Sequence, residues 1–225
     1  VTFNVDLTNP ELNITHPIEG GNYTSQVLNI NFSINDTNID YCQFTNNSWT
    51  SNITFSCANG DNNFSSNNLE GNNTWDIIVV DQAGNSNISS ITFFIDSILP
   101  FIQFVPITTI SRNQTENWIF ANVSASDTNL DTVSIYLFNA SGILNMTNGT
   151  SPLSINFTEL VEGIYYLNAS ADDTIGHINS TETRVIIIDT TAPTILLNGP
   201  NGFINSTIVN FTFNISDNLQ DYFTC

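Results

Sequence analysis

Asparagines placed two positions before a serine or threonine are the residues of this chain with the clearest chemistry. The 225 residues include 36 asparagines and 49 serines and threonines, and random placement would give roughly 8 Asn-x-Ser/Thr sequons. The sequence has 20, none with a central proline. Sequons accept N-linked glycans in secreted proteins, so we predict dense N-glycosylation; the alternative is neutral polar filler on exposed strands. The candidate acceptors are Asn13, Asn22, Asn31, Asn35, Asn46, Asn52, Asn63, Asn72, Asn87, Asn113, Asn122, Asn139, Asn145, Asn148, Asn156, Asn168, Asn179, Asn205, Asn210 and Asn214.

Three cysteines, Cys42, Cys57 and Cys225, predict one disulfide. Disulfides are favoured in extracellular proteins. Because Cys42 and Cys57 fall on neighbouring candidate strands, we predict that these two are bridged. Cys225 has a place similar to that of Cys42, since each follows a tyrosine after an aspartate-rich loop, and its partner is expected beyond this sequence. Without a CxxC pair or a flanking histidine, a zinc site is not supported.

Loop aspartates form the third candidate site. Carboxylate oxygens are ligands that Ca²⁺ prefers, and in the sandwich fold argued below these loops are expected to meet at one end of each module. We therefore predict calcium sites that stiffen the joints between modules; the alternative is that the aspartates cap turns. The first predicted group is Asp6, Asp36, Asp40 and Asp81, and the second is Asp96, Asp127, Asp131, Asp172 and Asp173.

Catalytic machinery has little support in the sequence. The two histidines, His16 and His177, fall in non-equivalent loops, and no Ser-His-Asp set, Cys-His set or glycine-rich phosphate loop stands out. A pair of carboxylates can hydrolyse glycosides, but the aspartates of this chain recur as structural punctuation. We therefore predict that the protein is not an enzyme.

The charge balance narrows the classes of partner. Arg112 and Arg184 are the only lysine or arginine residues, and the net charge is −19. Such a surface repels phosphate groups, so nucleic acid and anionic lipid are not expected partners. Only 10% of the residues are charged, so solubility must depend on neutral asparagine, serine and threonine. No run approaches the roughly 20 apolar residues of a membrane span.

A repeated stretch divides the chain into modules. An apolar residue, an aspartate, three further residues and a proline recur at positions 5–10, 95–100 and 188–193. A fixed period of this size indicates a tandem array, and modules of about 90 residues are large enough to bury their own cores. We predict a last strand of a preceding module at 1–9, module 1 at 10–98, module 2 at 99–191, and the first strands of a truncated module at 192–225. The chain is thus expected to be a window of a longer polypeptide.

Hydrophobic alternation predicts strands throughout. Apolar and polar residues alternate at 27–34, and again at 118–125 and 208–215, as in strands with one buried face. Further strands are predicted at 75–80, 91–95, 164–169 and 185–188. About seven short strands per module are typical of immunoglobulin-like antiparallel β-sandwiches, whereas a jelly roll needs more strands. The predicted fold is all-β, with tandem sandwiches and an incomplete module at each end.

Four single residues refine this prediction. Gly84 and Gly176 are expected to supply the positive φ of tight hairpin turns. Tyr165 follows a Glu-Gly turn in the place of a tyrosine corner, and Trp75 occupies the corresponding region of module 1. The alternative is that both aromatic residues are ordinary core residues.

The ordered set of motifs resembles the Ig-like repeats of giant archaeal and bacterial cell-surface proteins. The closest matches are Asp-Gln-Ala-Gly-Asn at 81–85 and Asp-Thr-Thr-Ala-Pro at 189–193, whereas 173–177 and 96–100 depart from the pattern. The resemblance spans the whole chain and implies adhesion, surface-layer or filament roles outside the cell. It does not name a partner.

Our leading hypothesis is an extracellular, heavily N-glycosylated structural rod or filament on a microbial, archaeal cell surface. Its expected partners are copies of itself or neighbouring repeats of the same chain, joined covalently or by strand exchange. The alternatives are a ligand-binding adhesin or carbohydrate-binding module with a cell-surface or carbohydrate target, and an accessory domain of an extracellular hydrolase. Loops that differ between modules favour binding, and joints that match favour a spacer.

Overall fold

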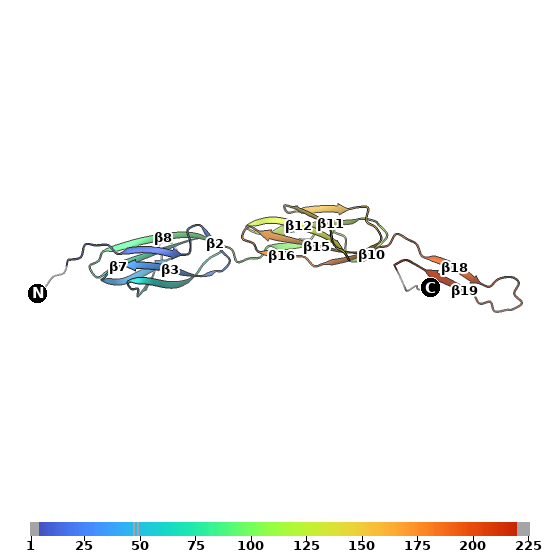
Figure 1. Ribbon diagram of the computed structural model, residues 1–225, viewed down its shortest axis with the longest axis horizontal. Helices are drawn as coiled ribbons and strands as arrows, with labels where there is room; N and C mark the ends of the chain where they lie inside the picture. Colours follow the sequence, from blue (N-terminus) through green and yellow to red (C-terminus); the bar gives the residue numbers. More distant parts are fainter. Residues whose placement is uncertain (1–4, 47, 49, 220–225) are drawn as a thin grey trace. The chain divides into compact units, whose positions relative to one another are not determined.

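The computed structural model describes residues 5–46, 48 and 50–219, and it is all-β. The chain divides into two compact units, unit 1 over Val1–Ile98 and unit 2 over Leu99–Cys225. Several of their strands are labelled in Figure 1. Among the described residues, no helix has the length and apolar character needed to cross a membrane.

Unit 1 is a sandwich of two sheets. One sheet has the order β1-β3-β6 and the other the order β2-β8-β7-β4-β5. All neighbouring strands are antiparallel except β2 and β8. The strands are β1 Glu11–His16, β2 Gly21–Tyr23, β3 Val27–Asn35, β4 Ile39–Thr45, β5 Ile53–Phe55, β6 Gly60–Asn67, β7 Gly71–Asp81 and β8 Ser86–Ile95.

Unit 2 repeats this plan. One sheet has the order β14-β11-β9 and the other the order β10-β17-β15-β12-β13, with the short β16 paired to β15. Here too the neighbours are antiparallel except for one edge pair, β10 and β17. The strands are β9 Phe101–Phe104, β10 Arg112–Gln114, β11 Ile119–Ser126, β12 Leu130–Asn139, β13 Gly142–Gly149, β14 Leu153–Phe157, β15 Gly163–Asp173, β16 Ile178–Ser180 and β17 Arg184–Ile188.

Strict alternation along the strands builds both cores. In β3, Leu28, Ile30, Phe32 and Ile34 are buried while most residues between them are exposed. This face packs against apolar residues of β4, β7 and β8 from the opposite sheet. In unit 2, β9, β11 and β14 bury an equivalent face against β12, β15 and β17. Since each fully buried apolar side chain contributes roughly 1.5–3 kcal/mol, these two faces supply most of the drive to fold.

Two aromatic side chains hold the same region of the two cores in different ways. Tyr165 is buried and donates its hydroxyl proton to the carbonyl of Val161 at 2.7 Å, which confirms a tyrosine-corner contact. Trp75 is fully buried and donates its indole N–H to the side-chain oxygen of Asn68, also at 2.7 Å. Both residues are therefore core aromatics whose polar atom is satisfied, as burial requires.

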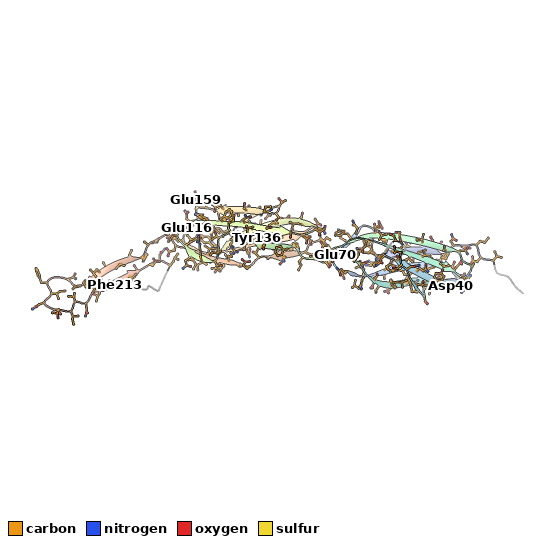
Figure 2. All side chains as sticks on the ribbon, turned by 180° about the vertical axis from the view of Figure 1, so that it is seen from behind. Asp40, Glu70, Glu116, Tyr136, Glu159 and Phe213 are labelled. Carbon is orange, nitrogen blue, oxygen red and sulfur yellow. A yellow bond between two sulfur atoms is a disulfide. The ribbon has the colours of Figure 1, made fainter. Side chains whose placement is uncertain are left out.

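A third pair of strands, β18 Thr194–Gly199 and β19 Thr212–Ser216, repeats the opening of each module. In all three copies, the residue after the joint proline pairs with the residue before the loop aspartate. These pairs are Glu11 with Asn35, Phe101 with Ser126, and Thr194 with Ser216. Phe213 of β19, labelled in Figure 2, is exposed, whereas the inward residues of β3 and β11 are buried.

Some boundaries differ from the sequence-based prediction. Residues 208–211 lie outside β19, because the partner strand β18 ends at Gly199 and leaves them without a ladder. Residues 5–10 belong to no strand, and the rest of the strand predicted at 1–9 lies outside the described residues. The modules also contain more strands than the seven expected, because short edge strands such as β2 and β10 pair with the second sheet.

We predict that Tyr165→Phe destabilises unit 2 by about 1 kcal/mol, because the Val161 carbonyl loses its hydrogen-bond donor. Urea unfolding monitored on peptides of unit 2 by hydrogen exchange measures the change. Tyr166→Phe is the matched control, since Tyr166 is the exposed neighbour. Equal effects of the two substitutions would show that the corner contact contributes nothing.

Candidate functional site

One buried aspartate organises the last hairpin of each module, Asp81 in module 1 and Asp173 in module 2. One oxygen of Asp81 accepts hydrogen bonds from the backbone N–H groups of Ala83 and Asn85, both at 2.8 Å, and the other accepts one from the Asn85 side chain. Asp173 accepts backbone hydrogen bonds from three residues of its own turn, 175–177, at 2.7–2.9 Å. Its second oxygen lies 2.8 Å from Nδ1 of His177.

These turns have matched backbone and electrostatic properties. Gly84 and Gly176 have φ values of 91° and 100°, as the predicted hairpin turns require. Burial raises the pKa of Asp81 and of Asp173, but the hydrogen bonds from their turns outweigh it, so both pKa values lie below the ordinary value. A carboxylate held charged by several donors is the mark of a turn cap.

The other aspartates that recur along the chain also cap turns. Each accepts a hydrogen bond from the backbone N–H two residues on, which is the geometry of an Asx turn. These bonds measure 2.7–3.2 Å and form at Asp6, Asp36, Asp96, Asp127, Asp189 and Asp217. The repeated aspartates therefore have a structural role in every copy, whether or not any of them binds a cation.

Three aspartates of the first predicted calcium group do lie together. Ligand oxygens of Asp6, Asp36 and Asp81 are within 4.8 Å of one another in unit 1. Asp40, labelled in Figure 2, is not part of this group: it lies at an irregularity of β4, between Ile39 and Tyr41, and is exposed. The three clustered carboxylates also accept hydrogen bonds from their own loops, so turn capping alone can account for them. Calcium binding there stays a prediction.

The second predicted calcium group is divided between the two units. Asp96 is buried at the end of unit 1. Within unit 2, Asp173 is buried in its turn, whereas Asp127 and Asp172 are half-buried and Asp131 is exposed. The role that the structure gives Asp127 and Asp173 is turn capping.

Matched asparagines hold the segment that enters each module. The side-chain amide of Asn87 donates to the carbonyl of Pro10, and that of Asn179 donates to the carbonyl of Pro100, each at 2.9 Å. In unit 1, Asn85 adds a hydrogen bond to the carbonyl of Asp6 at 3.2 Å. Sequence reasoning treated Asn87 and Asn179 only as sequons. Their matched position, three residues after the turn glycines Gly84 and Gly176, was the signal for a second role.

Matched glutamates hold the segment that leaves each module. Glu70, labelled in Figure 2, accepts hydrogen bonds from the backbone N–H of Ser97, at 3.0 Å, and from the Ser97 hydroxyl. Glu162 accepts hydrogen bonds from the backbone N–H and the hydroxyl of Thr190, at 3.0 and 2.6 Å, and from the hydroxyl of Thr191 at 2.5 Å. In each module, the glutamate that precedes a glycine at 70–71 and 162–163 thus binds the joint at the end of that module.

The outgoing contact of unit 2 perturbs its carboxyl group. Hydrogen bonds from the side chains of Thr190 and Thr191 lower the pKa of Glu162 from 4.5 to about 2. The carboxylate form is therefore the form that binds the joint. Sequence reasoning missed this role, because a glutamate and two threonines 28 and 29 residues away have no local pattern in common.

The predicted disulfide between Cys42 and Cys57 is confirmed. Cys42 is fully buried on β4, Cys57 follows β5, and their Cα atoms are 5.8 Å apart. The bridge thus fastens the end of the edge strand β5 to the neighbouring strand β4. Cys225 lies outside the described residues.

The sequon asparagines lie mainly on the surface. Seventeen of the twenty are exposed, and Asn122, Asn139 and Asn168 are half-buried. The side-chain oxygen of Asn122 is buried without a hydrogen-bond partner among the described residues, because residues 105–109 run alongside β11. Asn31 and Asn63 face each other directly across β3 and β6.

The two histidines have separate surroundings. His177 contacts its turn aspartate, as described, and His16 makes an edge-to-face contact with Tyr23, with ring centroids 5.3 Å apart. His177 thus has a structural partner in its own turn, and His16 has one on the next strand, β2.

Among known proteins, similarity to this chain is found only with solved structures of low sequence identity. No family model and no curated protein match the chain. Similar solved structures include fibronectin(III)-like modules of Clostridium thermocellum CbhA, at 14% identity over 79% of this chain and 94% of that chain, with a TM-score of 0.38. A tetra-tandem repeat from the extending region of a large adhesion protein has 17% identity over 83% of this chain, which spans about half (51%) of that chain, with a TM-score of 0.40. A solved chain from a study of a 1.5-MDa bacterial ice-binding adhesin has 13% identity over 86% of this chain and 70% of that solved chain, with a TM-score of 0.36. The fold assignment itself rests on the strand order and cores described above.

We predict that the contact between Glu162 and the joint at Thr190 and Thr191 loosens in acid. Because the pKa of Glu162 is lowered when folded, its contribution is complete above its ordinary value near 4.5 and is lost as the pH falls towards about 2. A carbon-detected NMR titration of the Glu162 carboxyl group measures this midpoint. Thr190→Val should raise it, and Thr183→Val, which changes a threonine outside this contact, should not. A midpoint near 4.5 in the unmodified chain contradicts the contact.

We predict that Cys42→Ala with Cys57→Ala lowers the free energy of unfolding of unit 1 by roughly 3 kcal/mol, because a loop of this length is no longer closed in the unfolded chain. Urea unfolding measures the change. Thiol reduction of the unmodified chain should produce a loss of similar size. An unchanged midpoint in both cases contradicts a stabilising role for the bridge.

The calcium prediction has a direct test in unit 1. Bound Ca²⁺ should release or absorb heat in calorimetry and raise the melting temperature of unit 1, because it stabilises the folded state by mass action. Asp6→Asn should abolish both effects, and Asp40→Asn should leave them intact. No heat and no rise at millimolar calcium leave turn capping as the role of these carboxylates.

Proposed function

We propose that this chain is part of an extracellular structural protein in which glycosylated Ig-like modules act as a spacer or filament on a cell surface. The observation that carries the proposal is the repeated fastening of both ends of a module. Asn87 and Asn179 bind the entering segment, and Glu70 and Glu162 bind the leaving segment. A module whose task is spacing needs fixed exits more than it needs variable loops.

The disulfide supports an oxidising compartment. Bridges such as Cys42–Cys57 form and persist in secreted proteins and are rare in the cytosol. N-linked glycans are added to proteins that enter the secretory route, so the sequons and the bridge favour the same location. We therefore place the protein outside the cell in this proposal.

N-glycosylation gives the outer faces a physical role. With 10% charged residues and many exposed sequons, the sheets present neutral amides and hydroxyls to water. A hydrated sugar coat would keep such faces apart and cover strand edges, which otherwise pair with other chains. The partners in this proposal are neighbouring repeats and other copies of the chain. The motif resemblance at residues 81–85 and 189–193 extends the proposal to an archaeal source.

Immunogold electron microscopy of the native cells tests the proposal. Antibody against the chain should label a fibrous or layered structure outside the cell, and protease treatment of intact cells should remove the label. An antibody against a cytosolic enzyme is the control and should keep its signal. Label confined to the cytoplasm, and resistant to protease until the cells are lysed, contradicts the proposed function.

A further inference from the structure

A cavity of about 410 Å³ opens on the three-stranded sheet of unit 2. Its volume falls within the roughly 300–1,000 Å³ of small-molecule sites. Its lining combines exposed apolar groups with polar ones: Ile107 is 67% exposed, Ile110 57% and Trp118 38%. The full lining is Ile107, Thr108, Thr109, Ile110, Arg112, Trp118, Phe120 and Asn156. A ligand bound in this cavity would cover apolar side chains that are otherwise exposed to water.

The walls of the cavity are held in place. Segment 108–109 is fastened to Phe120 by hydrogen bonds between Thr109 and both backbone polar groups of Phe120, at 2.9 and 3.0 Å. Arg184 donates to the carbonyls of Thr108 and Thr109 at 3.1 and 3.2 Å. Both arginines of the chain therefore serve this place, since Arg112 lines the cavity itself.

The backbone of Trp118 is held in place by the side chain of Gln114. The side-chain amide of Gln114, which is buried, donates to the carbonyl of Trp118 at 2.6 Å and to that of Glu116 at 3.1 Å. Glu116, labelled in Figure 2, also lies 3.9 Å from the Arg112 guanidinium. The aromatic wall and the cationic wall are thus positioned by one short loop.

One lining residue is itself a candidate for modification. Asn156 begins the sequon Asn156-Phe157-Thr158, and the register of β11 and β14 places it directly opposite Phe120. Side chains at opposite positions of antiparallel strands have Cβ atoms roughly 4.5–5.5 Å apart. Because Phe157 is buried, Asn156 and Thr158 project from the outer face, where Phe120 also lies. A sugar linked to Asn156 therefore starts at the rim of the cavity.

The matching residue pair in unit 1 has neither the aromatic residue nor the sequon. Counting back seven residues from the loop aspartates pairs Phe120 with Asn29, and the residue opposite Asn29 is Ser65. Neither an aromatic side chain nor a sequon asparagine stands at that pair. The aromatic residue and the sequon therefore occur together in unit 2 and are both missing from the matched pair of unit 1.

Because Asn156 lies at the rim of a cavity with aromatic and cationic walls, we propose that the N-linked glycan of Asn156 occupies this cavity. The first pyranose folds back on the sheet and lays its C–H face on Phe120 and Trp118, which offer large apolar surfaces. Its hydroxyl groups reach Arg112, whose guanidinium carries five N–H donors. The glycan thereby covers the apolar walls and acts as a structural part of unit 2. This inference rests on the proposed glycosylation of the chain.

The test uses the full chain from a host that glycosylates it. Thr158→Ala removes the sequon without altering Asn156, and Thr150→Ala is the matched control, because it removes the sequon of Asn148 on β13 of the opposite sheet. We expect Thr158→Ala to lower the melting temperature of unit 2 by about 3–6 °C and to speed hydrogen exchange in β11 and β14. Thr150→Ala should change neither quantity.

A second set of measurements makes the contact itself visible. Nuclear Overhauser effects should connect sugar protons with the rings of Phe120 and Trp118. In a Phe120→Ser background, Thr158→Ala should have a smaller effect on stability than in the unmodified chain, because one of the two aromatic partners of the sugar is already absent. Should Phe120→Ser fail to fold, the Overhauser effects in the unmodified chain decide the matter alone.

Three results would overturn the inference. Glycopeptides with sugar at other sites but none at Asn156 would contradict this inference and leave the proposed function intact. Sugar at Asn156 without Overhauser contacts, and with equal effects of the two threonine variants, would contradict it in the same way. A chain without sugar at any sequon would remove both the inference and the glycosylation on which the proposed function depends.

Discussion

The constraint on which this structure depends is the two-sided strand. Central strands of both units, such as β3 and β11, bury alternate residues between the two sheets and turn the residues between them outward. The inward face is aliphatic and aromatic. The outward face has few charged groups to offer, because the chain has 10% charged residues and almost no cations. Asparagine, serine and threonine fill that face, and their repeated spacing creates the sequons.

Backbone hydrogen bonding explains why the joints repeat. A chain that leaves one sandwich must leave its last N–H and C=O groups satisfied, and small polar side chains do this at every copy. Asp81 and Asp173 close the final hairpins, Asn87 and Asn179 bind the entering prolines, and Glu70 and Glu162 bind the leaving residues. The clustered carboxylates of unit 1, Asp6, Asp36 and Asp81, accept hydrogen bonds from their own loops, and these bonds give a reason for their presence without a cation.

Local pattern was enough to predict the sandwich fold, most strand positions, the bridge between Cys42 and Cys57, and the glycine turns, because alternation and period are written in neighbouring residues. It was not enough for features set by tertiary structure. The pairing of Glu162 with Thr190, and of Asn179 with Pro100, joins residues far apart in sequence. Asp40 was placed with the loop aspartates by spacing alone, yet an irregularity of β4 turns it to solvent.

The central claim is that the neutral outward faces of these modules carry sugar. Site-by-site glycopeptide mapping of the chain purified from its native source tests it most directly, with the same mapping after chemical deglycosylation as the control. The account predicts modification at most of the exposed sequon asparagines and little at the half-buried Asn122, Asn139 and Asn168. Unmodified asparagines throughout, in protein recovered from the cell surface, would contradict it.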